Sequence, residues 1–482
     1  MNWRIIGQVV GILMVATGLS MLFPLAWSHW YEDGGEKAFL LSMAFCCLGG
    51  GVLYGMLRGP MGEGLSQKDG MSIVAAGWVA VSFCGSLPFF FSGFVPGFTD
   101  AFFESVSGFT TTGASILEDI EALPQGLLFW RSQIQWIGGM GIILFSIAIL
   151  PFLGVGGMQL YKAEVPSPVP DKLKPRIQET ARILWKVYLL FSLMMFVLLL
   201  CGGMDVFDSL CHTFTTMPTG GFSTKNLSIA HYESLYIESV IMFFMVLAGI
   251  NFALHFRLLR GDGLCFWRDG ECRFFLLALG GLVLFVSLGL WGRVYETLGE
   301  SLRYGSFQVI SIVTTTGFAT ADYTFWTPAA QLVIFFGMFT GACAGSTSGG
   351  IKLIRFMVCA RYCHKELFSL VHPRGVREVK LGGRVVPEGV IHGILGFMAL
   401  YLGIFALGAL VLTTLGSDVV TAVTATASAL GNVGPGFGAV GPAENYAGIS
   451  VSGKWVLAWL MLLGRLEIYT LIIFLLPEFW RQ

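Results

Sequence analysis

Residues 100–115 read DAFFESVSGFTTTGAS, and this stretch decides the fold because the chain contains its plan four times. The other three stretches are DSLCHTFTTMPTGGFST at 208–224, ESLRYGSFQVISIVTTTGFAT at 300–320 and SDVVTAVTATASALGNVGPGFG at 417–438. Each is a semi-hydrophobic segment that ends in a Thr/Gly or Asn/Gly cluster. The corresponding glycines are Gly113, Gly221, Gly317 and Gly434, at intervals of 108, 96 and 117 residues. Self-similarity of this kind predicts four structurally related units.

The composition places these units in a membrane. Of the 482 residues, 55% are hydrophobic and 12% are charged, whereas a soluble domain has roughly 25% charged residues. The net charge of −1 argues against a nucleic-acid partner, which would require a basic excess. The ten Cys include no CxxC and no zinc-type Cys/His set, so they are interpreted as small buried hydrophobes.

Ten stretches reach the roughly 20 apolar residues that a spanning helix needs. They cover about 5–28, 37–57, 71–94, 127–151, 181–202, 236–258, 273–294, 329–363, 389–412 and 454–476. An even number puts both termini on one side. The termini and the alternating loops 58–70, 162–186, 257–273 and 352–384 carry 22 of the 29 basic residues. The excess of positive charge predicts that these parts face the cytoplasm.

The expected fold is therefore an all-α integral membrane protein with ten transmembrane helices. Two N-terminal helices precede four span–pore-helix–span repeats arranged around a pseudo-fourfold axis. The expected boundaries are 1–70 for the N-terminal helices, then 71–160, 161–262, 263–372 with an interrupted second helix, and 373–482.

The repeated glycine clusters predict re-entrant loops. Asp100, Asp208 and Ser417 are candidate helix-start residues, and each short helix is long enough for only half the bilayer. Bare backbone at membrane depth is tolerated where protein buries it or where it lines a watery cavity. Four loops around one axis would direct carbonyl oxygens and negative helix ends at one point, which suits a partly dehydrated monovalent cation. The alternative for a single cluster is a helix break or a packing contact.

The strings TTTGAS, TMPTGGFST, TTTGFAT and GNVGPGFG, in this order between paired spans, resemble the selectivity-filter loops of the Trk/Ktr/HKT superfamily of potassium transporters. The two leading spans and GRLEIYT near the C-terminus are similar to the TrkH-type bacterial membrane subunits. The resemblance implies a K⁺ pore of four unlike repeats in the cell inner membrane, a homodimer, and gating by a cytoplasmic nucleotide-binding ring, TrkA. It implies K⁺ as the transported ion, with no organic cofactor.

The resemblance also implies which residues form the filter. Their backbone carbonyls would come from Thr111, Thr112, Gly113, Thr219, Gly220, Gly221, Thr315, Thr316, Gly317, Asn432, Val433 and Gly434. In the second repeat either Gly220 or Gly221 can be the equivalent glycine, and Gly221 is chosen because Gly-Phe-Ser-Thr then matches Gly317-Phe-Ala-Thr. Sodium-selective relatives have Ser at the glycine position of the first loop, whereas all four loops here have Gly. This difference favours K⁺ over Na⁺. None contains TVGYG, so selectivity is expected to be modest.

The eighth span is too long for a straight crossing, and its middle has poor helix propensity. One interpretation is an unwound segment that obstructs the pore under the filter, and the other is small-residue packing between helices. A phosphate-binding loop is disfavoured because the Lys-Ser/Thr ending is missing. The candidate gating residues here are Gly341, Gly345, Ser346, Thr347, Ser348, Gly349 and Gly350.

Three intramembrane polar features remain. Arg465, placed near the middle of the last span, is expected to face the pore as an electrostatic barrier, since a charge at that depth needs a partner or water. The alternative is a buried ion pair, although Glu467 lies only two residues away, on a different helix face. Glu104 either raises the local cation concentration or binds backbone behind the filter. Asn251 and His255, four residues apart, are expected to form a packed polar pair.

The sequence thus predicts K⁺ uptake across the membrane. The alternative is a secondary transporter that couples K⁺ or Na⁺ to H⁺ or Na⁺, although such proteins typically have inverted repeats and an ionisable coupling residue at the midplane. An enzyme is not expected, because no nucleophile, base and orienting residue occur together. The expected partners are the lipid bilayer, a second copy of the chain and a TrkA-like ring, with no nucleic acid.

Overall fold

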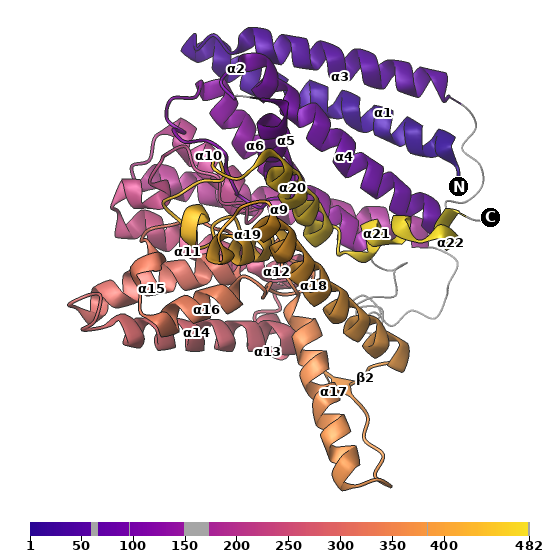
Figure 1. Cartoon of the computed structure of the whole chain (residues 1–482), viewed down its shortest axis with the longest axis vertical. Helices are drawn as coiled ribbons and strands as arrows, with labels where there is room; N and C mark the ends of the chain where they lie inside the picture. The colour runs from indigo at the N-terminus through magenta and orange to yellow at the C-terminus, as the bar shows by residue number, and fades with distance from the viewer. Residues whose placement is uncertain (59–65, 96, 149–172, 383, 481–482) are drawn as a thin grey trace.

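The computed structural model describes residues 1–58, 66–95, 97–148, 173–382 and 384–480. It is predominantly helical, as Figure 1 shows. The N-terminal part consists of α1 (Trp3–Ser20), α2 (Leu22–Tyr31) and α3 (Glu36–Met56). Helix α1 packs against α3 and against the next helix of the chain, α4.

After these helices, one order of elements recurs four times: a long helix, a short helix, a loop and a further helix. The first set is α4 (Gln67–Ser92), α5 (Phe98–Phe109) and α6 (Gln125–Ala148). The second is α9 (Leu173–Cys201), α10 (Val206–Thr216), η1 (Ser228–Tyr232), α11 (Leu235–Gly249) and α12 (Phe252–Leu259). The third is α13 (Cys265–Arg268), α14 (Gly270–Leu290), α15 (Leu298–Val313), η2 (Tyr323–Phe325), α16 (Pro328–Gly337) and α17 (Leu353–Val371). The fourth is β1 (Lys380–Leu381), β2 (Arg384–Val385), α18 (Glu388–Thr414), α19 (Val419–Gly431), η3 (Gly438–Val440), α20 (Val451–Arg465), α21 (Tyr469–Ile472), η4 (Ile473–Leu475) and α22 (Pro477–Trp480).

The strands β1 and β2 form an antiparallel pair in which Lys380 lies opposite Val385. Helix α17 projects from the helical body beside this pair (Figure 1). The two ends of the chain lie near each other, and the rings of Trp3 and Trp480 stack with their centroids 6.2 Å apart.

The four short helices α5, α10, α15 and α19 occupy the interior. Every residue of α5 from Ala101 to Phe109 is buried, polar side chains included, and α19 is buried in the same way from Thr424 to Gly431. A helix that is buried on all sides must be enclosed by other helices. The long helices supply that enclosure and expose large apolar side chains, such as Leu48, Leu193 and Leu277, on their outer faces.

Within the described ranges, six helical segments are long and apolar enough to cross a membrane. They are Trp3–Tyr31, Glu36–Met56, Lys68–Ser92, Thr180–Cys201, Gly270–Leu290 and Glu388–Thr414. Two bent pairs, Leu235–Gly249 with Phe252–Leu259 and Val451–Arg465 with Tyr469–Leu475, raise the number to eight if each pair is one span. The expected spans 127–151 and 329–363 correspond to α6 and to the separate helices α16 and α17.

The expected span 236–258 is not one straight helix but the bent pair α11 and α12. The chain bends by 103° between α11 and α12, because Asn251 caps α12 by accepting from the backbone N–H of Ala253 at 2.9 Å. His255 bonds the carbonyl oxygen of Leu247 through Nε2 at 2.8 Å. The expected Asn251–His255 pair is wrong, because each of the two side chains bonds a backbone group instead of the other side chain.

The expected span 454–476 is likewise a bent pair of helical segments. Helix α20 ends at Arg465, and the chain turns by 113° into the following helical segment. Glu467 and Ile468 have φ of 58° and 55°, which is an unusual backbone conformation for a β-branched residue such as Ile468. Arg465 thus lies at the end of a helix and not in the middle of one.

The short helices begin near the expected residues but not at all of them. Asp205, rather than Asp208, caps α10, and Asp418, rather than Ser417, caps α19. Asp100 and Asp208 lie in the first helical turn, where the helix dipole also favours a carboxylate. In α5 and α10 an earlier residue, Gly97 or Asp205, takes the capping position, so Asp100 and Asp208 bind elsewhere; in α19 the helix starts one residue later than expected.

Some expectations fall outside the described residues. Residues 59–65 belong to the expected loop 58–70. Residues 149–151 are the end of the expected span 127–151, and residues 162–172 are the first part of the expected basic loop 162–186.

Candidate functional site

The loops that follow the four short helices share one backbone geometry. One residue at or just after the end of each short helix is left-handed: Thr111, Thr219, Thr315 and Asn432 have φ between 53° and 58°. The glycine two positions later is left-handed too, with φ of 82° at Gly113, 78° at Gly221, 83° at Gly317 and 104° at Gly434. Gly221 therefore matches the other three glycines, whereas Gly220 has no positive φ.

Each loop starts as a Schellman helix ending. In the first, Thr111 N–H donates to Gly108 O at 3.0 Å and Thr112 N–H to Ser107 O at 2.8 Å. The same two bonds recur after α10, α15 and α19. Glycine normally takes the left-handed position of this motif, so three threonines there are uncommon and strained, at about 1–3 kcal/mol each. Strain repeated at three matching positions points to a functional constraint on the loops.

The four loops interlock in a closed order. A Cβ added at Gly113 would lie 2.2 Å from the carbonyl oxygen of Gly220, in the second loop. An added Cβ would lie 1.9 Å from Thr316 O at Gly221, 2.1 Å from Val433 O at Gly317, and 2.8 Å from Thr112 O at Gly434. Each of these four glycines thus touches the residue that precedes the corresponding glycine of the next loop, and the fourth returns to the first. Gly is required here because any side chain would overlap a neighbouring carbonyl.

Most carbonyls of these loops accept no hydrogen bond from the described part of the chain. Among the twelve residues 111–113, 219–221, 315–317 and 432–434, accepted bonds are found at two carbonyls only. Gly220 O accepts from Gln135 Nε2 at 2.7 Å, and Gly434 O accepts from Ser428 Oγ and Tyr446 Oη at 2.6 and 2.7 Å. Seven of the other ten carbonyls belong to buried residues, and because buried carbonyls are normally bonded, they call for water or a cation as their partner.

The backs of the loops are fixed by side chains from other elements. Gln135 of α6 also accepts from Phe222 N–H at 3.2 Å. Asn432 Nδ2 donates to Thr112 Oγ1 at 3.0 Å, which joins the fourth loop to the first. Tyr323 Oη donates to Gly436 O at 2.9 Å and joins the third loop to the fourth.

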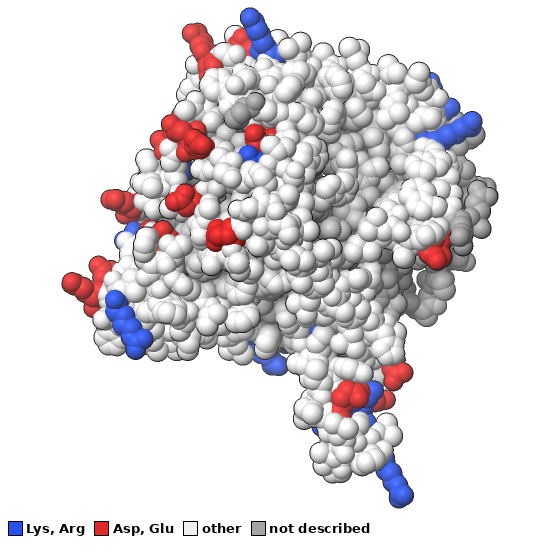
Figure 2. Space-filling model, viewed as in Figure 1, with Lys and Arg blue, Asp and Glu red and all other residues white. Residues whose placement is uncertain are grey.

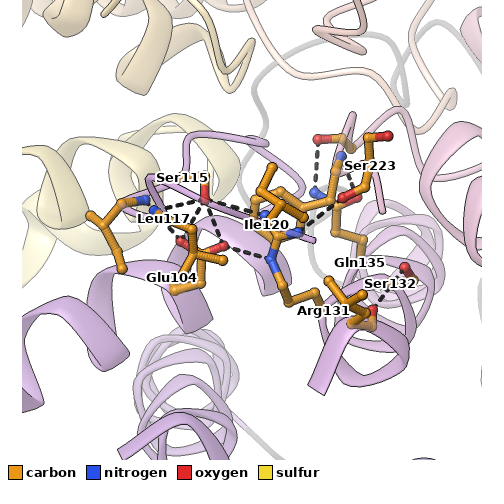
Figure 3. Close-up of polar contacts among 12 residues, drawn as sticks. Glu104, Ser115, Leu117, Ile120, Arg131, Ser132, Gln135 and Ser223 are labelled. Carbon is orange, nitrogen blue, oxygen red and sulfur yellow. Dashed lines mark hydrogen bonds and ion pairs between the residues drawn. The ribbon is translucent and has the colours of Figure 1, made fainter. Parts of the chain in front are cut away.

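Glu104 bonds groups behind the first loop, which is one of the two roles expected for it. The side chain is fully buried, and its Oε1 lies 2.8 Å from Arg131 Nε. Figure 3 shows Glu104 and Ser115 on one side of the Arg131 guanidinium and Ser223 on the other. Arg131 donates to Ser223 O at 3.0 Å and lies over the Phe222 ring, 4.2 Å from its centroid.

The residues between α16 and α17 form a non-helical segment, 338–352, held by backbone bonds. Cys343 N–H donates to Gly249 O at 3.0 Å, and Phe252 N–H donates to Gly345 O at 3.1 Å. These bonds satisfy the backbone groups that the break between α11 and α12 leaves free. Gly349 N–H donates to Thr315 Oγ1 at 2.6 Å, so the segment lies directly against the third loop.

Gating candidates from two parts of the chain meet in this region. Arg465, which is 2% exposed, donates from Nη1 to Thr347 O at 2.8 Å. Its Nε and Nη2 have no hydrogen-bond partner among the described residues. Glu467 pairs with Arg355 of α17, and Lys352 bonds Ser346 and Ser348.

Glu271 is a further residue of the site that the sequence analysis did not single out. It lies in the first turn of α14 and accepts through Oε1 from Ala344 N–H at 2.8 Å and from Ile354 N–H at 3.2 Å. Arg131 and Gln135 were overlooked in the same way. For Arg131 the available signal was an ionisable side chain within the expected span 127–151, as at Arg465; Glu271 lies just before the expected span 273–294, and Gln135 is not ionisable.

Acidic side chains gather on the side of the molecule where α10, α11 and α15 lie (Figures 1 and 2). The loop after the first filter glycine contributes the exposed residues Glu118, Asp119 and Glu121. The Asn226 amide donates to Asp119 at 2.9 Å, and this bond lowers the pKa of the Asp119 carboxyl. The carboxyl is therefore ionised at neutral pH, and the contribution of this bond is lost only as the pH falls through the lowered pKa.

The apolar helices and the buried, backbone-lined meeting point of four loops define an integral membrane protein of the transport class. A model of the TrkH family, described as a cation transport protein, matches residues 35–481. The Trk system potassium uptake proteins TrkH of Salmonella typhimurium and Escherichia coli K12 are each 40% identical to the chain over 487 residues and covered in full. The crystal structure of the potassium transporter TrkH from Vibrio parahaemolyticus matches with a TM-score of 0.92 at 37% identity, with both chains fully covered.

The chain therefore belongs to the TrkH family of cation transport proteins. The family resemblance expected from the four loop strings is confirmed. The expectation that the chain is no enzyme is confirmed too, because its relatives are transport proteins.

Proposed function

We propose that the protein takes up potassium across the cell inner membrane through one pore per chain, formed by the four loops. The observation that carries the proposal is the closed order of the loops together with ten loop carbonyls, seven of them in buried residues, that accept no bond from the described chain. Those oxygens suit a dehydrated monovalent cation. The names of the relatives, which are potassium uptake proteins, specify the ion.

The charges near the loops support a cation rather than an anion. The twelve filter positions contain no Lys or Arg, and the C-terminal ends of α5, α10, α15 and α19 point their partial negative charge at the loops. The acidic face described above would raise the local cation concentration at the entrance.

The membrane arrangement proposed for this function has ten spans. The six apolar helices, the two bent pairs, α6, and α16 with α17 would each cross once, and four repeats would surround a pseudo-fourfold axis. Both termini would lie in the cytoplasm, as the distribution of Lys and Arg predicts. The adjacent positions of Trp3 and Trp480 agree with termini on one side.

We further propose that residues 341–350 and Arg465 gate the pore. The bond from Gly349 N–H to Thr315 Oγ1 places the segment against the filter loops, and Arg465 adds a positive charge that repels K⁺ from the same region. The regulator would be a TrkA-like cytoplasmic ring acting on a homodimer. The word "system" in the names of the relatives is in keeping with further components.

The proposal is tested by reconstituting the full chain in proteoliposomes. Under an imposed voltage, uptake of K⁺ and Rb⁺ should exceed uptake of Na⁺, and protein-free vesicles provide the baseline. Equal uptake of K⁺ and Na⁺, or uptake no greater than the baseline in well-folded protein, would contradict it.

The Glu271→Ala variant should conduct faster than wild type. The substitution removes the oxygen that accepts from Ala344 and Ile354, so the gating segment loses an anchor at two backbone N–H groups, each worth about 1–3 kcal/mol when buried without a partner. Glu271→Gln keeps a carbonyl oxygen and should stay near wild type. Rb⁺ flux and thermal unfolding are measured on all three proteins. A less stable alanine variant with wild-type flux would separate Glu271 from gating.

A further inference from the structure

We propose that Glu104 and Arg131 are positioning residues for ion selection: their buried pair fixes the first and second filter loops against each other. This inference rests on the proposed function, because it assigns the pair a role in the same pore. Neither residue belongs to the filter itself or to the gating segment.

The pair contacts both loops just beyond the filter glycines. Glu104 accepts from Ile116 N–H at 3.1 Å and from Ser115 Oγ at 3.1 Å, both in the first loop. Arg131 donates to Ser115 Oγ at 3.2 Å and to Ser223 O, in the second loop, at 3.0 Å. One guanidinium therefore joins α5 and the first loop to the second loop (Figure 3).

Helix α6 holds the second loop at adjacent points. Arg131 and Gln135 lie four residues apart and therefore on one face of α6, and both are buried. Between them they bond Gly220 O, Phe222 N–H and Ser223 O, while the guanidinium covers the Phe222 ring. A shift of Arg131 would thus move the carbonyl of Gly220, against which Gly113 packs.

Comparison of the four repeats singles out this pair. Glu104, His212 and Gln308 each lie nine residues before their filter glycine, and all three are fully buried. His212 Nε2 bonds Ser223 Oγ at 3.0 Å, and Gln308 Nε2 donates to Ala321 O at 2.8 Å, so each side chain reaches the chain just past its own filter glycine. The fourth repeat has Ala425 at this position. At this position, Glu104 forms an ion pair, with Arg131, and that pair extends into the next loop, whereas His212 and Gln308 bond groups of their own repeats.

The charges of the pair give its role a signature that packing alone would not have. With both partners present, the charge behind the first two loops is balanced. Glu104→Gln leaves a positive charge there and should raise the KM for K⁺, whereas Arg131→Met leaves a negative charge and should lower it. Both variants loosen the contact between the loops, so both should lower the K⁺/Na⁺ uptake ratio.

The test is a double-mutant cycle of Glu104→Gln and Arg131→Met in proteoliposomes, with KM, the K⁺/Na⁺ ratio and thermal unfolding measured on each protein. The ratio should fall about tenfold, equivalent to about 1.4 kcal/mol of ion preference, in both single variants and in the double variant. The double variant, which leaves no unbalanced charge, should recover stability but not selectivity. If a single variant fails to fold, the double variant carries the test.

The matched control is the pair Glu238 and Arg303, which joins α11 to α15 at 2.7 Å without bonding a filter loop. Glu238→Gln with Arg303→Met should keep the wild-type ratio. A wild-type ratio in folded Glu104 and Arg131 variants, or an equal loss in the control, would overturn the positioning role. If wild type itself shows no K⁺ preference, the proposed function fails first and this inference fails with it.

Discussion

Gly221→Ala should abolish selective potassium uptake while leaving the protein in the membrane. The glycine has φ of 78°, and an added Cβ would lie 1.9 Å from the carbonyl oxygen of Thr316, in the next loop. The left-handed conformation costs an alanine about 1–2 kcal/mol, and overpacking adds about 1–3 kcal/mol. The overlap is with backbone, which cannot rotate away as a side chain can. The carbonyl of Thr316 must therefore move, and uptake should fall by about a hundredfold.

The control for Gly221→Ala is Gly203→Ala. Gly203 has φ of 87°, but a Cβ added there would meet no atom within 4 Å. This variant carries the conformational cost of alanine without the overlap. K⁺ and Na⁺ uptake by both purified variants should therefore differ, with Gly203→Ala near wild type. Wild-type selectivity in a folded Gly221→Ala protein would remove Gly221 from the filter.

Arg465→Ala should increase cation flux. A unit positive charge that faces the proposed ion path opposes a cation there, and a barrier lowered by about 1.4 kcal/mol or more on its removal should raise flux at least about tenfold. The cost to stability should be lower than that of breaking a buried ion pair, because the bond that is lost is the one to Thr347 O, worth about 1.5–3 kcal/mol. Arg465→Lys keeps the charge and should remain close to wild type.

Arg355→Ala provides the contrast. Arg355 is paired with Glu467 and lies over the Phe397 ring, so its loss leaves a carboxylate without its partner and should destabilise the protein by about 3–5 kcal/mol. Flux and thermal unfolding of both variants distinguish a barrier from a structural pair. A destabilised Arg465→Ala protein with unchanged flux would show that Arg465 is structural.

The family, the membrane location and the non-helical residues within the eighth span were all predictable from the sequence. The Thr/Gly strings are local signals, and the low helix propensity of 341–350 marks a break. The 103° and 113° bends were missed because a hydropathy window averages over them. Asn251 was taken as a residue within a helix, although an Asn in an apolar run is also a helix-start signal.

The detailed geometry of the site required the three-dimensional structure. No local rule places Thr111, Thr219 and Thr315 in the left-handed conformation, which β-branched residues avoid; contacts between loops impose it. The role of Glu104 stayed open because its partner, Arg131, lies 27 residues away in another helix. Pairings of this kind depend on how helices pack, which spacing along the chain does not specify.

We expect the four unlike loops to form one cation site lined by backbone carbonyls. Crystals of the full chain soaked in Tl⁺ or Rb⁺ would locate the ion by anomalous scattering. Anomalous peaks should then lie on the axis between the loops, with carbonyl oxygens of 111–113, 219–221, 315–317 and 432–434 as ligands. Peaks coordinated by side chains elsewhere, or by loops from fewer than four repeats, would contradict this expectation.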